Sequence, residues 1–217
     1  MNKLLVGAVL IVGLVVSGCQ STRQITDYGP RYQPTNIVAV SNLPPSVRRV
    51  ALLPVGQHRE GSAISEGVER LSGVLETELR KTQSFEIVRV SPQQLQQWTG
   101  RSAWRADQAL PTNLVSRIRT ETGCDAVIFA TLTAFRPYPP LAVGWDLRLI
   151  EIESHKVLWA VDELLDAGAA PVSRAAKDYS EAQLYGGRSA DDTTVLQSPQ
   201  RFGQFAAAIL AATLPPR

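Results

Sequence analysis

The side chains of this chain that most often act as nucleophiles or soft metal ligands are few: Cys19, Cys124, His58 and His155. A hydrolytic triad needs a histidine beside a nucleophile and a carboxylate. The sequence has neither a GxSxG motif nor a Cys–His pair in such a context. The spacings HExxH and CxxC, which serve zinc or redox chemistry, are also missing. We therefore expect a protein that is not an enzyme and needs no metal or cofactor.

Cys19 stands at the end of the first apolar stretch. One positive charge at Lys3 precedes residues 4–16, which carry no polar side chain. A helix over this stretch rises about 20 Å, less than the roughly 30 Å of a bilayer core, so the pattern is typical of a secretory signal and not of a permanent span. The sequence VSGC (16–19) resembles the bacterial lipobox, in which cleavage precedes a cysteine that carries a diacylglycerol. The alternative is a buried cysteine that ends an N-terminal core helix.

A lipid on Cys19 predicts how the chain is divided. Residues 1–18 are the signal peptide, residues 19–47 are a lipidated tether rich in Pro, Gly, Ser, Thr and Asn, and residues 48–217 are a single domain. Within the tether, residues 37–40 can pair as a short edge strand.

The residue after the cysteine predicts which membrane holds the anchor. Aspartate at that position favours the inner membrane in the enterobacterial sorting pattern, and this chain has Gln20. Acyl chains on Cys19 then tether the domain without spanning the bilayer. We expect an outer-membrane lipoprotein whose domain lies in the periplasm.

Charge and composition narrow the class of partner. The formal net charge is +2, and loss of Lys3 with the signal peptide leaves +1, so no basic balance indicates nucleic acid. A hydrophobic content of 44% with 19% charged residues is typical of a globular domain. Once Cys19 carries lipid, Cys124 has no disulfide partner, and its place at the start of an apolar strand predicts a small buried thiol.

The domain begins with a strand–helix–strand unit. Within residues 48–55, Val50, Leu52 and Leu53 form an apolar run that Pro54 ends, as expected of a central strand buried on both faces. Residues 62–83 predict a helix that Ser62 or Ser65 caps. Its buried face is one stripe at helical spacing: Ile64, Val68, Leu71, Leu75 and Leu79. A second strand at 85–90 makes the sheet at least partly parallel.

Helices and then an antiparallel meander complete the predicted sheet. One helix starts at Ser91-Pro92 and ends at Gly100, and another spans about 112–122 and ends at Gly123. Strands at 126–135, 142–154 and 156–165 follow, and short connections make the last two antiparallel. The fold class is α/β: a mixed β-sheet, with a strand–helix–strand start and a later meander, and helices packed on it.

The last fifty residues predict two helices around a loop. Residues 171–184 are a weak helix and residues 185–197 a loop. Residues 198–214 form a terminal amphipathic helix with Ser198 as its N-cap. It either docks on the sheet or contacts lipid or a partner subunit.

Five residues are candidates for binding a partner protein. Trp98, Trp104 and Arg105 lie on a polar connection, and aromatic and arginine side chains are the usual anchors of interfaces. The alternative is that they tuck under the edge of the sheet. Tyr138 stands between prolines at a projecting tip, and Trp145 follows in the strand beside it. The alternative for this pair is a stiff hairpin connection.

Several segments together resemble a group of envelope proteins. They are RRVALLPV (48–55), FEIVRV (85–90), TGCDAVIFATLTAF (122–135) and ESHKVLWAVDE (153–163). The pattern is similar to that of the curli secretion-channel lipoproteins, the Pel exopolysaccharide lipoprotein, the lipoprotein activators of penicillin-binding proteins and the TolB amino-terminal domain. The resemblance covers residues 48–165 and implies an α/β sandwich of the TolB amino-terminal, anticodon-binding-like type. It also implies a non-enzymatic role in envelope assembly or export.

Three functions follow from this resemblance and the anchor. The first is an accessory or scaffold in an envelope or secretion complex, acting through self-association or an envelope protein partner. The second is a binding module that activates a peptidoglycan synthase, which needs a long tether and one exposed patch. The third is a lipoprotein that binds a glycan or small molecule, for which Trp98 and Trp104 are the only candidates to line an aromatic pocket.

Overall fold

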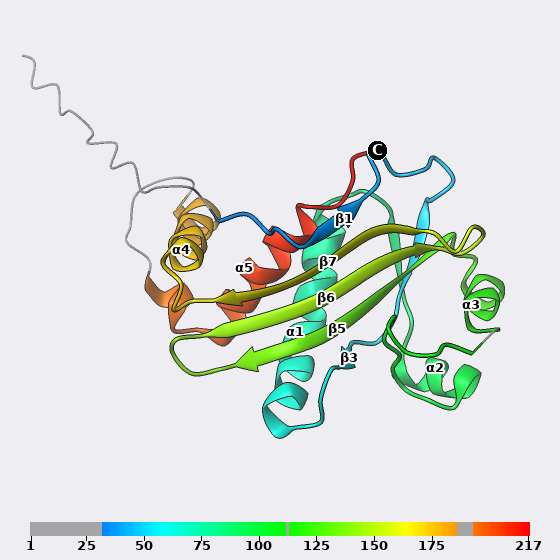
Figure 1. The fold of residues 1–217 in the computed structure, drawn as a ribbon, viewed down its shortest axis with the longest axis horizontal. Coiled ribbons are helices and arrows are strands. Elements are labelled where there is room, and N and C mark those ends of the chain that lie inside the picture. The colour runs from blue at the N-terminus through cyan, green and yellow to red at the C-terminus, as the bar shows by residue number, and fades with distance from the viewer. Residues whose placement is uncertain (1–31, 112, 186–192) are drawn as a thin grey trace, which may run out of the picture.

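The computed structural model describes residues 32–111, 113–185 and 193–217 (Figure 1). One mixed seven-stranded sheet has the order β1-β7-β6-β5-β2-β4, and β3 pairs with β5 beside this path. The strands are β1 (Ile37–Ala39), β2 (Arg49–Leu52), β3 (Gly56–Gln57), β4 (Glu86–Arg89), β5 (Ala126–Arg136), β6 (Ala142–Glu151) and β7 (Val157–Asp166). Strands β2, β3, β4 and β5 pair in parallel, whereas β5, β6, β7 and β1 pair antiparallel. The predicted α/β fold with a mixed sheet is confirmed.

Strand β2 is the centre of the parallel half. Val50 and Leu52 point into one core, and Ala51 and Leu53 point into a second core on the opposite face. Helix α1 (Ser62–Lys81) covers the first face, and helices α2 (Pro92–Thr99) and α3 (Leu114–Thr122) cover the second. The predicted strand buried on both faces is confirmed.

Helix α1 buries the predicted stripe, but its start differs from the prediction. Leu71, Leu75 and Leu79 are fully buried. The N-cap is Gly61, and no side chain caps the helix. Ser62 is already the first helical residue, and the Ser65 hydroxyl donates instead to Oε1 of Gln57 at 3.2 Å. The prediction that one of these serines caps α1 was wrong.

Helices α2 and α3 begin and end as expected of their caps. Ser91 and Gln94 form a capping box, with distances of 3.1 Å from the Gln94 N–H to the serine hydroxyl and 2.9 Å from the Ser91 N–H to the glutamine Oε1. Gly100 and Gly123 end the two helices with φ of 79° and 65°, which glycine adopts without steric cost.

The antiparallel half is covered by the C-terminal part of the chain. Helix α5 (Pro199–Ala211) buries Phe202 and Phe205 and lies beside α1 and against β6 (Figure 1). Helix α4 (Ala170–Tyr185) and a 3₁₀ helix (Thr193–Leu196) lie next to it. Between α1 and α5 the buried carboxylate of Glu78 accepts hydrogen bonds from Lys81 at 2.7 Å and from Gln204 at 3.0 Å. No helix in the described ranges is long and apolar enough to cross a membrane.

Three hydrogen bonds fasten the start of the described chain to Glu163 on β7. The Tyr32 hydroxyl donates to one carboxylate oxygen at 2.7 Å, and the backbone N–H groups of Thr35 and Asn36 donate to the other at 3.2 Å each. The carboxylate and burial raise the pKa of the Tyr32 hydroxyl, so this group stays a donor. We call this arrangement the Glu163 clasp.

The Glu163 clasp and β1 show that residues 32–47, which we assigned to the tether, pack on the domain. Residues 37–39 form the edge strand that the sequence allowed, paired antiparallel with β7. Beyond β1, Leu43 and Val47 are buried in the α1 core. The Pro- and Ser-rich composition masked these two apolar contacts. The tether that the sequence predicts therefore ends before Tyr32.

Candidate functional site

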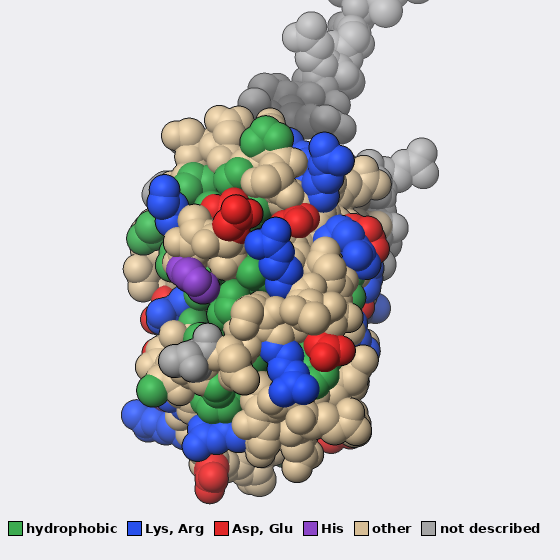
Figure 2. Space-filling view, turned by 90° about the vertical axis from the view of Figure 1, so that its right-hand side faces the viewer, with side chains coloured by type: hydrophobic (Ala, Val, Ile, Leu, Met, Phe, Trp, Pro, Cys, Tyr) green, Lys and Arg blue, Asp and Glu red, His purple; other side chains and the backbone are tan. Residues whose placement is uncertain are grey.

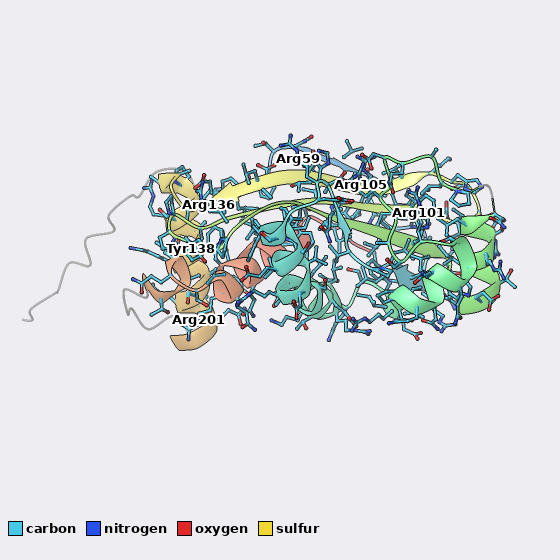
Figure 3. All side chains as sticks on the ribbon, turned by 90° about the horizontal axis from the view of Figure 1, so that it is seen from below. Arg59, Arg101, Arg105, Arg136, Tyr138 and Arg201 are labelled. Atoms are coloured by element: carbon cyan, nitrogen blue, oxygen red, sulfur yellow. The ribbon has the colours of Figure 1, made fainter. Side chains whose placement is uncertain are left out.

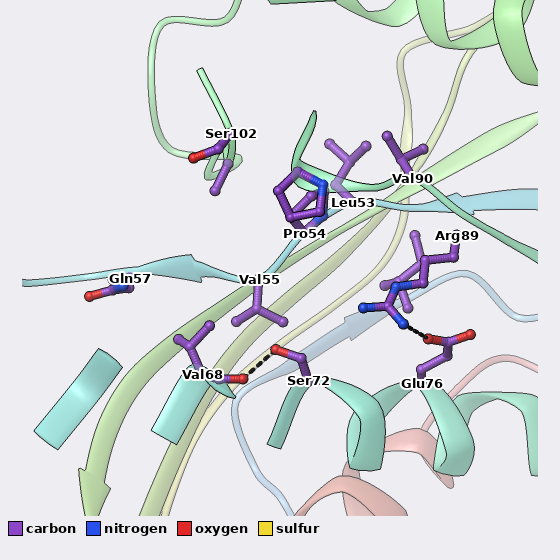
Figure 4. Close-up of a pocket in the computed structure, with 13 residues that line it drawn as sticks. Leu53, Pro54, Val55, Gln57, Val68, Ser72, Glu76, Arg89, Val90 and Ser102 are labelled. Atoms are coloured by element: carbon purple, nitrogen blue, oxygen red, sulfur yellow. Dashed lines mark hydrogen bonds and ion pairs between the residues drawn. The ribbon is translucent and has the colours of Figure 1, made fainter. Parts of the chain in front are cut away.

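The parallel half brings two chain connections to opposite faces of the sheet. From the carboxyl end of β2 the chain passes through β3 to α1 on one face. From the carboxyl end of the adjacent β4 it passes to α2 on the other. A crevice forms where neighbouring parallel strands send the chain to opposite sides, and ligands of open α/β sheets bind in such crevices. This point of the fold holds a pocket (Figure 4).

The pocket has a volume of about 260 Å³ and an aliphatic floor. The floor residues come from the end of β2, the segment between β2 and β3, α1 and the residue after β4: Leu52, Leu53, Val55, Val68 and Val90. Polar groups from Gln57, Glu76, Arg89 and Ser102 also line it, and no aromatic side chain does. The third predicted function, a glycan or small-molecule binder with Trp98 and Trp104 as its lining, therefore finds no support in this pocket.

Two guanidinium groups share one carboxylate at the pocket. Oε1 of Glu76 accepts from Nε and Nη2 of Arg80 at 3.1 and 2.8 Å. The other oxygen, Oε2, lies 3.6 Å from Nη1 of Arg89 (Figure 4). The Glu76 side chain is 16% exposed and that of Arg89 is 62% exposed. The group of three charges is positive overall, and its accessible member is Arg89.

The remaining polar groups of the pocket favour binding over bond-making chemistry. The Ser72 hydroxyl donates to the Val68 carbonyl of its own helix, so it is not held by a base (Figure 4). No histidine or cysteine lines the pocket. The arrangement can hold a ligand with an apolar body and an anionic head.

The structure separates the predicted partner-binding residues into buried and exposed ones. Trp104 is 6% exposed, and its indole N–H donates to the Thr99 hydroxyl at 2.7 Å. The guanidinium of Arg101 lies 4.8 Å from the centroid of its ring. Trp98 is half-buried against the same core. The alternative reading, in which these tryptophans tuck under the sheet, is what the structure shows, and Trp104 is not a surface anchor.

Arg105 is a link between two loops. Its Nη1 donates to the carbonyls of Gln57 and His58 at 3.1 and 3.3 Å, and its Nε and Nη2 donate to both oxygens of Asp107 at 2.8 and 3.1 Å. The hydrogen bonds from Arg105 lower the pKa of the Asp107 carboxyl. With its donors committed in this way, Arg105 positions loops.

Tyr138 and Trp145 lie in opposite environments. Trp145 is fully buried on the helix-covered face of β6, so the prediction that it binds a partner was wrong. Tyr138 is 76% exposed, at the tip that joins β5 and β6. Figure 3 shows Tyr138 beside Arg136 at one end of the molecule, away from Arg101 and Arg105. The predicted residues therefore do not form one surface.

The two cysteines differ in what the structure says of them. Cys19 lies outside the described residues. Cys124 is 1% exposed and unpaired, and burial raises the pKa of its thiol, as expected of an unreactive core cysteine.

In the described ranges no three histidine, cysteine or acidic side chains come close enough to hold a metal ion. Figure 2 shows the α2–α3 end, where basic and acidic side chains lie interspersed.

Sequence reasoning missed the pocket and its two charged residues. Neither Glu76, in the helix predicted over 62–83, nor Arg89, in the strand predicted over 85–90, was a candidate site residue. The signal that locates the pocket is the alternation of covered faces after β2 and β4. That alternation depends on the order of strands in the sheet, which the sequence does not state.

No family model and no curated protein matches this chain. Among solved structures, the PelC dodecamer from Paraburkholderia phytofirmans is similar at a TM-score of 0.42 and 14% identity, over 85% of this chain and 97% of that chain. The LpoB C-terminal domain from Salmonella enterica has a TM-score of 0.36 and 16% identity, over 54% and 82%. TolB from Acinetobacter baumannii has a TM-score of 0.30 and 14% identity, over 69% and 31%.

These structures come from the group that the sequence resembles. With TM-scores below 0.5, the likenesses carry no inference about individual residues, ligands or assembly.

Proposed function

We propose that the chain is an outer-membrane lipoprotein, anchored through Cys19, whose periplasmic domain is a non-enzymatic accessory or scaffold of a cell-envelope assembly or secretion complex. The observation that carries the proposal is the sequence VSGC (16–19) directly behind an apolar stretch of signal-peptide length. The pocket supports a binding role, because Glu76 is ion-paired, the Ser72 hydroxyl is bonded within its own helix, and no histidine or cysteine lines it.

The distance from the anchor to the domain favours an accessory that works close to its membrane. Residues 20–31 separate Cys19 from Tyr32, where the Glu163 clasp begins. Fully extended, this segment reaches roughly 40 Å, whereas the tether predicted to residue 47 reaches roughly 90–100 Å. An activator of a peptidoglycan synthase needs reach, so the shorter segment counts against that alternative.

The anchor is tested by metabolic labelling with an alkyne fatty acid, followed by separation of inner and outer membranes. We expect label on the wild-type chain in the outer membrane, no label on Cys19→Ala, and unchanged label on Cys124→Ala, the matched control. Gln20→Asp should move the labelled chain toward the inner membrane. Label that persists on Cys19→Ala, or a wild-type chain released with soluble periplasmic proteins, contradicts the proposal.

The accessory role is tested by complementation and by mass in solution. Cys19→Ala should fail to restore a deletion strain while its thermal unfolding midpoint stays unchanged, because the described contacts of both cores begin at Tyr32 and need no lipid. Light scattering over a concentration series then separates two modes of action. A discrete closed oligomer indicates a scaffold, and a strict monomer indicates a module that acts on one partner. Full complementation by unlipidated Cys19→Ala contradicts the role of the anchor.

A further inference from the structure

We propose that the pocket at the carboxyl ends of β2 and β4 binds an aliphatic carboxylate, with the apolar group on the floor and the carboxylate on Arg89. The chemistry is shared by a free branched-chain acid and by the C-terminal residue of a peptide. This goes beyond the proposed function, since it concerns what the domain binds and not where it is anchored.

The floor selects for a small branched apolar group. Every floor side chain is aliphatic; β2 contributes its last residue, Leu52, and Leu53 follows it directly before Pro54. The volume of about 260 Å³ is close to nine times the share of one water molecule in the liquid, which is about 30 Å³. It falls just below the usual range of drug-sized pockets, which begins near 300 Å³. One leucine-sized group with its carboxylate suits this space.

Arg89 has unused donors for the carboxylate. A guanidinium carries five N–H donors in a fork that matches a carboxylate. In the described part of the chain, the only ionic contact of the Arg89 side chain is the 3.6 Å approach to Glu76, and no hydrogen bond is formed there. Glu76 is bound more closely by Arg80, at 2.8 Å. A ligand carboxylate can therefore bind the Arg89 guanidinium, because Glu76 is already paired with Arg80.

The charge of the site fits one negative charge. Arg80 and Arg89 against Glu76 leave one excess positive charge, and the other polar lining groups, Gln57 and Ser102, are neutral. A site for a phosphate dianion would need a second unpaired cation or a cluster of backbone N–H groups. The nearby N-terminus of α2 does not supply such a cluster, because the capping box uses the N–H groups of Ser91 and Gln94 and Pro92 has none, which leaves only that of Gln93 in the first turn.

Calorimetric titration of the full chain in lipid nanodiscs, with empty discs as the blank, tests the proposal. N-acetyl-leucine should bind with a Kd of about 0.1–1 mM, as expected of a ligand of its size. N-acetyl-leucinamide, which lacks the charge, should bind about tenfold more weakly. N-acetylglycine, which lacks the side chain, should show no heat. Equal affinity for the acid and its amide, or no binding of N-acetyl-leucine at about 10 mM, overturns the proposal.

Three variants locate the carboxylate. Arg89→Gln should weaken N-acetyl-leucine about tenfold, with folding intact because the side chain is exposed. Arg70→Gln is the matched control: it removes the same charge from the neighbouring helix, where Arg70 pairs with Glu66 outside the pocket. Glu76→Gln should tighten binding about threefold, since it removes the competing carboxylate. A loss of affinity that is the same for Arg89→Gln and Arg70→Gln, or weaker binding by Glu76→Gln, overturns the assignment to Arg89.

Two further ligands distinguish the sources. Tighter binding of N-acetyl-alanyl-leucine than of 4-methylpentanoate assigns the site to a peptide C-terminus, and the reverse order assigns it to a free acid. If neither competes with N-acetyl-leucine, the proposal fails. The intact mass of the same preparation reports lipid on Cys19, so failure of the ligand site and failure of the anchor are observed separately.

Discussion

The two halves of the sheet bury their strands in different ways. In the parallel half, helices lie on both faces of β2, and neighbouring residues of the strand enter two different cores. In the antiparallel half, α5 and its neighbours cover one face of β6 and β7. The opposite face carries Asp146 directly across from Asp162, with Arg148 hydrogen-bonded to Asp146 at 2.9 Å.

This difference explains the position of the pocket described above. Its aliphatic floor forms where the layers on both sides of the sheet part, at the carboxyl ends of β2 and β4. The one-sided half provides instead a polar surface and the attachment of the N-terminal segment at Glu163. The proposed ligand pocket and the fastened N-terminal segment thus lie in separate halves.

The largest expected effect tests the two patterns of burial directly. Leu52→Ala and Leu53→Ala should each cost about 2–5 kcal/mol in the free energy of unfolding, because Leu52, the last residue of β2, and Leu53, which follows it, are both buried. On β7, Leu165→Ala should cost a similar amount, and Leu164→Ala, whose side chain is 55% exposed, less than about 0.5 kcal/mol. Urea unfolding measures all four. A cost for Leu164→Ala that matches Leu165→Ala would contradict one-sided burial.

A smaller effect sharpens how closely α1 approaches β5. A Cβ at Gly67 would lie 2.6 Å from Cδ2 of Leu132 and 2.9 Å from Cβ of Phe135. Gly67→Ala should therefore cost about 1–3 kcal/mol. Gly73 in the same helix has no atom within 4 Å of that position, so Gly73→Ala should stabilise by about 0.5–1 kcal/mol. Thermal unfolding compares the two variants. Destabilisation by both would contradict the open space described at Gly73.

Two aspartates of β7 should respond to pH in opposite directions. Burial and the facing Asp146 raise the pKa of Asp162, so its ionised form destabilises the fold at neutral pH and this cost disappears as the pH falls below its unfolded value. The Gly168 N–H and then Arg136 lower the pKa of Asp166, so its contribution is present at neutral pH and lost on acidification.

Asparagine variants measure these contributions. At pH 7, Asp162→Asn should stabilise and Asp166→Asn destabilise, each by less than about 1 kcal/mol because both carboxylates are solvent-accessible. Both differences should shrink toward pH 3. By NMR, the Asp162 carboxyl should titrate with a pKa above that of an ordinary aspartate, and the Asp166 carboxyl with a pKa below it. Titration in the reverse order would contradict the described contacts.

The smallest effects concern one residue in each half that adopts a left-handed conformation. Gln83, after α1, has φ of 53°, and His155, in the β6–β7 turn, has φ of 56°. Glycine adopts this conformation without the clash that a Cβ causes, so Gln83→Gly and His155→Gly should each stabilise by about 0.5–1 kcal/mol. Gly123→Ala, at φ of 65°, should have the opposite sign. Chemical denaturation that gives all three the same sign would contradict this reading of the backbone.

Local patterns predicted most of the elements. The apolar run at 48–55 predicted a strand buried on both faces, and the stripe from Ile64 to Leu79 predicted α1 and its inward face. Both depend on residues close together in the chain, as do the glycine C-caps. The alternation on β6 also placed Trp145 with the core residues, which makes its nomination as a surface anchor inconsistent with the pattern of its own strand.

Features that depend on distant partners could not be predicted from local pattern. Trp104 is buried because α2 and its loop fold over the sheet, and only its contacts with Thr99 and Arg101 are local. Residues 32–47 look like a linker because the Glu163 that holds them is more than a hundred residues away. The pocket required the strand order, which places β2 between β4 and β5.

The Glu163 clasp has a mechanical consequence. Force applied through the N-terminal segment reaches Tyr32 and its three hydrogen bonds first, and then β1 from the end nearest Glu163. A load that pulls the segment away from β7 opens these hydrogen bonds one after another, from Tyr32 toward Ala39. Release of residues 32–40 would lengthen the segment by roughly 30 Å and remove the packing of Tyr32, Ile37 and Val40 against the α1 core. Residues 32–40 are therefore a reserve of tether length that stays folded on the domain until force releases it.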